Sequence, residues 1–92
     1  MLINEVHVDK LKTSDNIKRL MSNRNHTRKD LAKMIGVSEP AIANYLTGKN
    51  QPSLQTLGAL AKLYNVEISD IISYKEDIDY EEFKSENDQK TN

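Results

Sequence analysis

The stretch that decides the fold is Thr27–Gly48, TRKDLAKMIGVSEPAIANYLTG. Thr27 can cap a helix, and an acid three residues later completes a capping-box-like start. Gly36 offers the left-handed conformation that ends a helix. Ser38 is a further candidate N-cap, and Pro40 falls in the first turn of the next helix, where its missing N–H costs nothing. The stretch therefore predicts two helices joined by a short turn.

Small and apolar residues of the same stretch predict how the two helices cross. Ala32 falls in the middle of the first helix, where a small side chain lets the second helix approach closely. Val37 and Ile42 are placed to fill the angle between the helices, and Gly48 can close the second one. This is the helix-turn-helix arrangement, in which the second helix is placed to enter the major groove of DNA.

The flanking sequence predicts three more helices from its apolar spacing and its capping residues. Ser14 can cap a first helix, Ser53 can cap a fourth, and Asn65 can end that fourth helix. Val66 and Ile68 lead into a short fifth helix. The apolar residues of these helices are Ile17, Leu20, Met21, Leu54, Leu57, Leu60, Ala61, Tyr64, Ile71 and Ile72.

The expected fold class is all-α, with one compact five-helix domain over residues 13–73. Residues 1–12 are expected to form a short N-terminal arm, and the weak alternation of Val6 and Val8 also fits a short strand. Residues 74–92 are expected to form an acidic, partly disordered tail, in which Asp79–Ser85 fits a marginal helix.

Charge is distributed unevenly along the 92 residues. Residues 13–66 hold eight Lys or Arg against three acids, whereas residues 67–92 hold three Lys against nine acids. A basic core beside an acidic tail suggests a polyanionic partner, and ordinary surface solvation explains it equally well. The acidic tail could occupy a basic surface on a protein partner, or shield the basic core from non-specific DNA.

Composition argues against several classes of protein. Cysteine is absent, which excludes disulfides and thiolate metal sites. His7 and His26 are far apart in sequence, and neither a catalytic nucleophile constellation nor a glycine-rich phosphate loop accompanies them. We therefore expect no enzyme activity, metal or cofactor. The apolar runs are too short to span a membrane and no secretion signal is recognisable, so we expect a cytoplasmic protein.

Over about residues 14–72 the chain resembles the Cro and phage-repressor-like (XRE-type) helix-turn-helix family, whose domains have a lambda-repressor-like five-helix fold. The resemblance rests on Leu31–Ala32, Ile35–Ser38, Ile42, the loop TGKNQPS with Gly48 and Pro52, and LxxLAKLYNVEISDII. The chain departs from the family pattern at three places. Arg28 replaces a Gln that contacts phosphate. Met21 and Leu46 replace an Arg–Glu ion pair, a joint change that costs little when the apolar pair packs well. His26 replaces an apolar residue and is expected to be half-buried at the edge of the core.

The resemblance also implies which residues contact DNA. Asn44 can form a bidentate pair with adenine. Glu39 can accept from cytosine N4, or can simply place a favourable charge at a helix N-terminus. The implied base-reading residues are Ser38, Glu39, Pro40, Ala43 and Asn44. The implied phosphate-binding residues are Arg28, Tyr45, Thr47, Lys49 and Asn50.

The function expected from the resemblance is sequence-specific binding of double-stranded DNA by a transcriptional regulator, more often a repressor, with residues 38–46 in the major groove. We expect a homodimer, because one small module makes few base contacts. Its interface could involve Ile72, Tyr74, Ile78, Tyr80 and Phe83, or Leu2, Ile3, Val6 and Val8, and these residues could equally pack on their own domain. The alternative is an antitoxin-type interaction protein that sequesters a protein partner and regulates its own gene.

Overall fold

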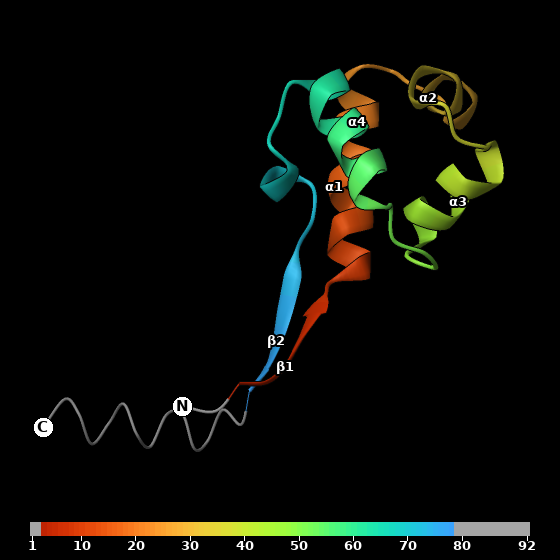
Figure 1. Cartoon of the computed structure of the whole chain (residues 1–92). Helices are drawn as coiled ribbons and strands as arrows, with labels where there is room; N and C mark the ends of the chain where they lie inside the picture. Colours follow the sequence, from red (N-terminus) through yellow and green to blue (C-terminus); the bar gives the residue numbers. More distant parts are fainter. Residues whose placement is uncertain (1–2, 79–92) are drawn as a thin grey trace, which may run out of the picture.

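The computed structural model describes residues 3–78, in which four α-helices form the body and two strands form a ribbon that extends from it (Figure 1). The bounds of the elements are β1 Ile3–Val8, α1 Lys10–Asn23, α2 Arg28–Ile35, α3 Glu39–Thr47, α4 Leu54–Tyr64, the 3-10 turn η1 Ile68–Asp70 and β2 Tyr74–Ile78. Elements from the two ends of the sequence, β1 and β2, lie side by side.

The core lies between the four helices and the residue that follows η1, and each of these five contributes one fully buried aliphatic side chain. These side chains are Ile17, Leu31, Ile42, Leu60 and Ile71. The remaining buried apolar residues are Met21, Ala32, Leu57 and Tyr64. The apolar spacing of the sequence therefore identified the core side of the helices, except at Leu54 of α4, which is 74% exposed.

The prediction that Ser14 caps the first helix is wrong. Helix α1 begins at Lys10, inside the segment expected to be an arm, and its N-cap is Asp9, whose side chain accepts a hydrogen bond from the Lys12 backbone N–H at 3.1 Å. Ser14 is instead buried in α1, and its hydroxyl donates to the carbonyl of Leu46 at 3.3 Å. The physical reason is that Asp9 follows directly on β1 in extended conformation, which is the geometry of an N-cap.

The prediction of a mostly helical domain is confirmed, but the five-helix count and the absence of strands are not. The fifth helix is only the 3-10 turn η1, closed by a hydrogen bond from the Glu67 N–H to the Asp70 carboxylate. The chain then turns away because the carbonyl of Ile71 is taken by Asn16 rather than by a further helical N–H. In addition, β1 pairs with β2 as a two-stranded antiparallel sheet. The structure therefore confirms the alternative prediction that the segment with Val6 and Val8 forms a short strand.

Polar groups of α1 fix the root of this ribbon. The Asp9 N–H donates to the Ser73 carbonyl at 2.6 Å, and the Ser73 N–H donates to the hydroxyl of buried Thr13 at 3.0 Å. One turn further along α1, the Asn16 amide donates to the Ile71 carbonyl at 2.8 Å and its oxygen accepts from Arg19 at 2.8 Å. The segment that leads into β2 is thus held by three hydrogen bonds.

Replacing Asn16 by alanine tests this attachment. Asn16→Ala removes the donor for a buried carbonyl, so we expect the free energy of unfolding to fall by about 1–3 kcal/mol. Asp15→Ala is the matched control, because Asp15 is exposed on the same helix and forms an exposed ion pair with Lys18 at 3.9 Å; the change should stay within about 0.5 kcal/mol. Urea unfolding curves measure both values. Equal effects of the two substitutions would refute the buried role of Asn16.

Some sequence-based expectations fall on residues outside the described range 3–78. They are the marginal helix at Asp79–Ser85, the disorder of the last residues and the acidic tail as a surface for a protein partner. The expected division of the chain into arm, domain and tail likewise remains an expectation. Its boundaries at residues 13 and 74 fall inside α1 and at the start of β2.

Candidate nucleic-acid interface

Helix α2 begins and ends as its sequence predicts. The Asp30 N–H donates to the Thr27 hydroxyl at 3.1 Å, and the Thr27 N–H donates to the Asp30 carboxylate at 2.9 Å, which completes a capping box. At the other end Gly36 adopts φ 74° and its N–H donates to the Ala32 carbonyl. Residues with a side chain adopt this left-handed conformation only at a cost, so the turn between α2 and α3 depends on Gly36.

The capping box makes a small part of the stability depend on pH. The pKa of the Asp30 carboxyl is held below its ordinary value. The hydrogen bond to the backbone of Thr27 is the largest cause, and the hydrogen bond to the Thr27 side chain is the second. A carboxyl with a lowered pKa in the folded state stabilises the fold above its ordinary pKa, and this contribution disappears as the pH falls through the lowered pKa. Asp30→Asn should therefore reduce the loss of stability on acidification, as measured by urea unfolding at neutral and acidic pH. An unchanged acid dependence would contradict the assignment.

Helix α3 lies against the core through one face and leaves another face accessible. The Ser38 hydroxyl accepts from the Ala41 N–H at 3.1 Å, and Pro40 stands in the first turn, as predicted. Ile42 is fully buried. The helix runs from Glu39 to Thr47, with Ser38 as its cap, which agrees with the predicted range 38–46 to within one residue.

The loop after α3 folds back onto the helix end. The Asn44 carbonyl accepts both from the Asn50 N–H at 3.3 Å and from the Thr47 hydroxyl at 3.2 Å. Gly48 ends the helix at φ 78°, and a Cβ built there would lie 3.2 Å from Cδ2 of Leu11 on α1. The loop that carries Lys49 and Asn50 is therefore fixed at the C-terminal end of α3, beside the first turn of α1.

A contact between His26 and Tyr64 holds the start of helix α2 against α4. Nδ1 of His26 lies 2.8 Å from the hydroxyl of Tyr64, within hydrogen-bond distance, and the two rings are tilted at 44° with centroids 5.6 Å apart. This contact joins the residue before the α2 cap to the last turn of α4. His26 is half-buried, which confirms the prediction for it. Burial raises the pKa of the Tyr64 hydroxyl, so Tyr64 stays protonated at neutral pH.

The five base-reading candidates lie on the accessible side of α3. Ser38, Glu39 and Pro40 are exposed, and Ala43 and Asn44 are half-buried. Residues 39 and 43, and likewise 40 and 44, are one helical turn apart and therefore belong to one face. This face is opposite in character to the one that carries Ile42: it holds a carboxylate, an amide and two small apolar groups, which can meet base edges and a thymine methyl.

Three of the phosphate-binding candidates lie at the C-terminal end of α3, and a fourth, Arg28, lies at the start of α2. Arg28 is exposed in the first turn of α2, and Thr47, Lys49 and Asn50 are exposed in the last turn of α3 and the loop after it. Tyr45 differs from the others, because it is half-buried and packs against the core. The structure thus brings Thr47, Lys49 and Asn50 together, leaves Arg28 exposed on α2, and gives Tyr45 a share in the packing of the domain. We refer to the four exposed residues as the phosphate rim.

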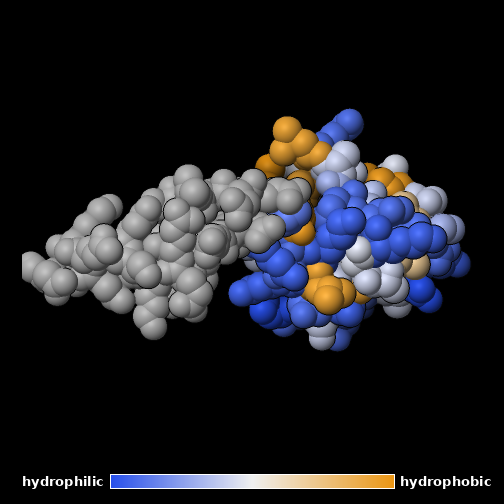
Figure 2. Space-filling view, turned by 90° about the horizontal axis from the view of Figure 1, so that it is seen from below, coloured by the Kyte–Doolittle hydropathy of each residue, from blue (hydrophilic) through white to orange (hydrophobic). Residues whose placement is uncertain are grey.

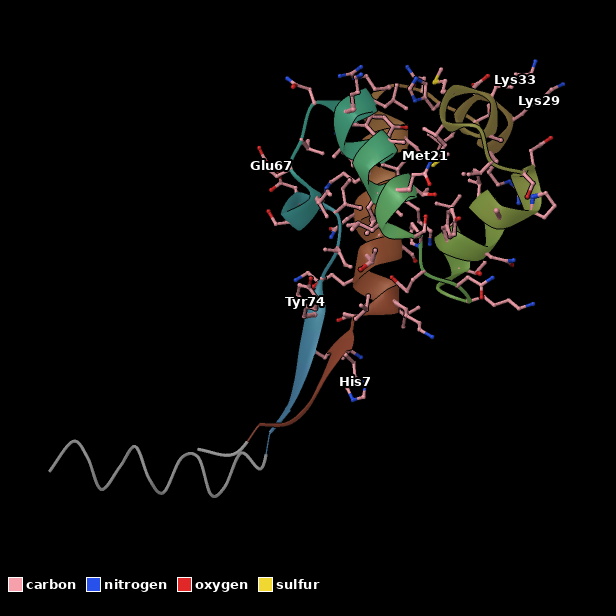
Figure 3. The ribbon with its side chains drawn as sticks, in the orientation of Figure 1. His7, Met21, Lys29, Lys33, Glu67 and Tyr74 are labelled. Carbon is pink, nitrogen blue, oxygen red and sulfur yellow. The ribbon has the colours of Figure 1, made fainter. Side chains whose placement is uncertain are left out.

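Three residues that sequence reasoning did not assign also belong to this region. Lys29 and Lys33 are exposed on α2, and Figure 3 shows them pointing away from the body. Gln51 precedes α4, and its Oε1 is the one buried side-chain polar atom in the described part of the chain that lacks a hydrogen-bond partner. The sequence feature that could have pointed to Gln51 is its position in the loop directly before Pro52.

Most of the visible surface in a view from below the body is hydrophilic, with hydrophobic residues in small separate patches (Figure 2). The large hydrophobic residues that are exposed, Leu11, Met34, Leu54 and Tyr74, come from different elements. Within residues 3–78 no group of three or more His, Asp or Glu residues is placed to hold a metal ion. The longest helix in that range has 14 residues, and none is long and apolar enough to cross a membrane.

The family model described as "Helix-turn-helix" matches residues 17–71, which are more than half of the chain. The chain belongs to the XRE-type helix-turn-helix family. A relative among curated proteins, an uncharacterised HTH-type transcriptional regulator of Methanocaldococcus jannaschii, is 43% identical over 53 residues, which are 58% of this chain and 80% of that protein. The HTH-type transcriptional activator BcrR of Enterococcus faecalis is 29% identical over 63 residues, which are 68% of this chain and only 31% of that protein.

Solved structures share the fold of this family member. The LexA SOS-response transcriptional repressor from Eubacterium rectale superposes with a TM-score of 0.66 at 30% identity, over 70% of this chain and 68% of that one. The P22 c2 repressor protein, solved in complex with synthetic operator 9T, superposes with a TM-score of 0.59 at 24% identity, over 62% of this chain and 86% of that one. At 24% identity, the similarity to the P22 c2 repressor shows only that the two proteins share a fold.

Proposed function

We propose that this protein is a transcriptional regulator that binds double-stranded DNA sequence-specifically, with α3 in the major groove. The observation that carries the proposal is the accessible face of α3. Its helix is held by the buried Ile42, the Gly36 turn and the His26–Tyr64 contact, and the face presents exposed Glu39 and half-buried Asn44. An α-helix fits the major groove, which distinguishes all four base pairs.

On this proposal, affinity for DNA comes mainly from the phosphate rim, which consists of Arg28, Thr47, Lys49 and Asn50. The reading face itself contains no Lys or Arg, the residue types that contribute most to attraction by phosphates. Arg28 at the start of α2 and Lys49 in the loop after α3 supply exposed positive charge, and the N–H groups at the start of α2 and α4 can add phosphate contacts. Such contacts position α3, whereas the base contacts of Asn44 and its neighbours select sequence.

We further propose that the protein acts as a dimer and as a repressor. A single domain reads a short site, and two copies related by a two-fold axis read two half-sites about one helical turn apart. The LexA repressor from Eubacterium rectale, which is 30% identical to this chain, supports this sign of regulation. The relative BcrR is an activator, so the sign depends on where the site lies relative to a promoter.

Selection of bound duplexes from a random pool, followed by gel shifts of the enriched duplex across a salt series, tests the proposal. We expect an enriched motif and an affinity that falls steeply as salt rises. A shuffled duplex of the same composition is the control and should bind more weakly, by about a thousandfold or more for a specific site. Equal binding of the enriched and shuffled duplexes would refute sequence-specific reading.

A further inference from the structure

Helices α2 and α4 pack against each other and leave an open groove of about 450 Å³ between their C-terminal halves. The residues that line it are Met34, Ile35, Ala59, Lys62 and Leu63. The three inner apolar residues, Ile35, Ala59 and Leu63, are half-buried, whereas Met34 and Lys62 are exposed. Four of the five lining residues are therefore apolar and keep part of their surface in contact with water.

Met34 is the lining residue that the packing of the domain explains least, because 51% of its surface is exposed. A single exposed hydrophobic residue is ordinary. Met34, however, shares one concave surface with three other apolar residues. The methionine side chain is flexible and polarisable, so it adapts to the shape of a partner. The groove thus has the character of a docking surface for an apolar side chain.

The two helices that form the groove are basic. They carry a single acid, Asp30, one turn before Met34, and its carboxylate already accepts from the Thr27 N–H at 2.9 Å. Figure 3 shows Lys29 and Lys33 pointing away from the body. A partner with negative charge beside its apolar group is therefore attracted to this surface. The basic residues of the two helices are Arg28, Lys29, Lys33 and Lys62.

The composition of the lining decides between a small molecule and a protein segment. Sites for small molecules combine apolar walls with several convergent polar groups that fix the orientation of the ligand. Of the five lining residues only Lys62 carries a polar side chain. One cation beside an apolar groove instead fits a protein segment that buries a bulky apolar side chain and has carboxylates next to it.

The acidic residues 79–92 of the same chain have a similar composition, but they start at the wrong end of the molecule. They follow β2, on the ribbon that Figure 1 shows extending away from the helices. Phe83 is five residues beyond β2, so an extended chain carries it back by at most about 18 Å. That is about the length of β2 itself and brings Phe83 only to the start of α1. The groove lies near the other end of α1, where Tyr64, the neighbour of Leu63, contacts His26.

We propose that this groove binds an acidic segment of a partner protein. The segment inserts one bulky apolar side chain between Met34 and Leu63 and places carboxylates beside Lys62 and Lys33. The role goes beyond DNA binding, because no lining residue belongs to the reading face of α3 or to the phosphate rim. The protein therefore holds DNA and this partner at the same time.

Selection from a random peptide library displayed on phage, against the full chain, tests the proposal. We expect enriched peptides in which Asp or Glu residues flank a bulky apolar residue. The affinity of an enriched peptide, made synthetically and labelled, is measured by fluorescence anisotropy without DNA. Met34→Glu and Lys62→Glu should each weaken its binding by about tenfold or more, because each places a carboxylate in the groove. Both residues are exposed, so circular dichroism should show an intact fold.

Two matched variants control for a general change of charge. Leu54→Glu makes the same change as Met34→Glu at another exposed hydrophobic residue, outside the groove on α4. Lys18→Glu makes the same reversal as Lys62→Glu at an exposed position of α1. Each should change the affinity of the peptide by less than about twofold. Enriched peptides that lack acidic residues, or groove variants that bind as well as their controls, would overturn the proposal.

Two further measurements exclude other occupants. A synthetic peptide of residues 79–92 that binds the groove more tightly than the enriched peptides would assign the groove to this chain's own C-terminal segment. A wild type that sediments as a dimer and becomes monomeric in Met34→Glu would assign it to a second copy. Either result would overturn the proposal of a partner protein.

DNA binding separates this proposal from the proposed function. The enriched peptide should bind the complex with DNA within about twofold of its affinity for the free protein, and displacement of the peptide by DNA would show that it binds the phosphate rim instead. Met34→Glu and Lys62→Glu should keep the preference of the wild type for the enriched duplex over the shuffled one. If that preference is absent in the wild type, the proposed function fails and the peptide result stands.

Discussion

Ile42→Ala is expected to lower the free energy of unfolding by about 2–5 kcal/mol. Ile42 has no exposed surface and is the one buried residue of α3, where it meets the core formed by Leu31, Leu60 and Ile17. Removing three carbons there loses their burial and leaves a cavity that the surrounding helices fill only in part. Because α3 has nine residues, it depends on this packing rather than on its own helical propensity.

Urea unfolding followed by circular dichroism measures the effect. Leu54→Ala is the matched control, since it also truncates a large aliphatic side chain, but one whose surface is 74% exposed; its effect should stay within about 0.5 kcal/mol. Ile42→Val should cost about 0.5–1.5 kcal/mol. If Ile42→Ala is no more destabilising than Leu54→Ala, α3 is not held by the core as described.

Asn44→Ala and Lys49→Ala are expected to impair DNA binding in different ways. Asn44 is the side chain of the α3 face best suited to a bidentate contact with adenine, so its loss should cost about 1–3 kcal/mol at one base pair of each half-site and relax preference there. Lys49 is exposed on the loop fixed by the Asn50–Asn44 hydrogen bond. Its loss should weaken binding to all sequences alike and lower the slope of log affinity against log salt by about 1.

Gel shifts with the enriched duplex and with each single-base variant of it measure both effects. Lys62→Ala is the control for a general change of charge, because Lys62 lies on α4 and was not assigned to the phosphate rim. Identical patterns of loss for Asn44→Ala and Lys49→Ala would show that the division into base-reading and phosphate-binding residues is wrong.

Local signals explain why the helix-turn-helix segment was predictable. Thr27, Ser38 and Ser53 cap their helices as expected, and Gly36 and Asn65 end theirs in the left-handed conformation. Each of these signals acts within a few residues of the chain. Their physical basis, hydrogen bonds to free N–H groups and a permitted positive φ, is visible in the sequence itself.

The ribbon and the start of α1 were not predictable in the same way. Asp9 and Ser14 are both competent caps, and the choice between them depends on where β1 ends. β1 in turn exists because it pairs with β2, about seventy residues away in sequence, and YKEDI reads as an acidic tail when taken alone. Pairing over that separation is a tertiary effect, and the strand propensity of either segment alone does not predict it.

The candidate site shows the same division. The exposed face of α3 followed from helical spacing and from the family resemblance, whereas the half-burial of Tyr45 and the unpaired Oε1 of Gln51 depend on packing. The roles of all ten predicted contact residues remain predictions until DNA binding is measured.

Replacement of single purines by their 7-deaza analogues in the enriched duplex tests most directly whether α3 reads the major groove. This change removes one acceptor, N7, from the major groove and leaves base pairing intact. We expect binding by the wild type to weaken at a few purines in each half-site, with the effect at one adenine absent in Asn44→Ala. Wild-type binding that is insensitive to the replacement at every purine would contradict the account.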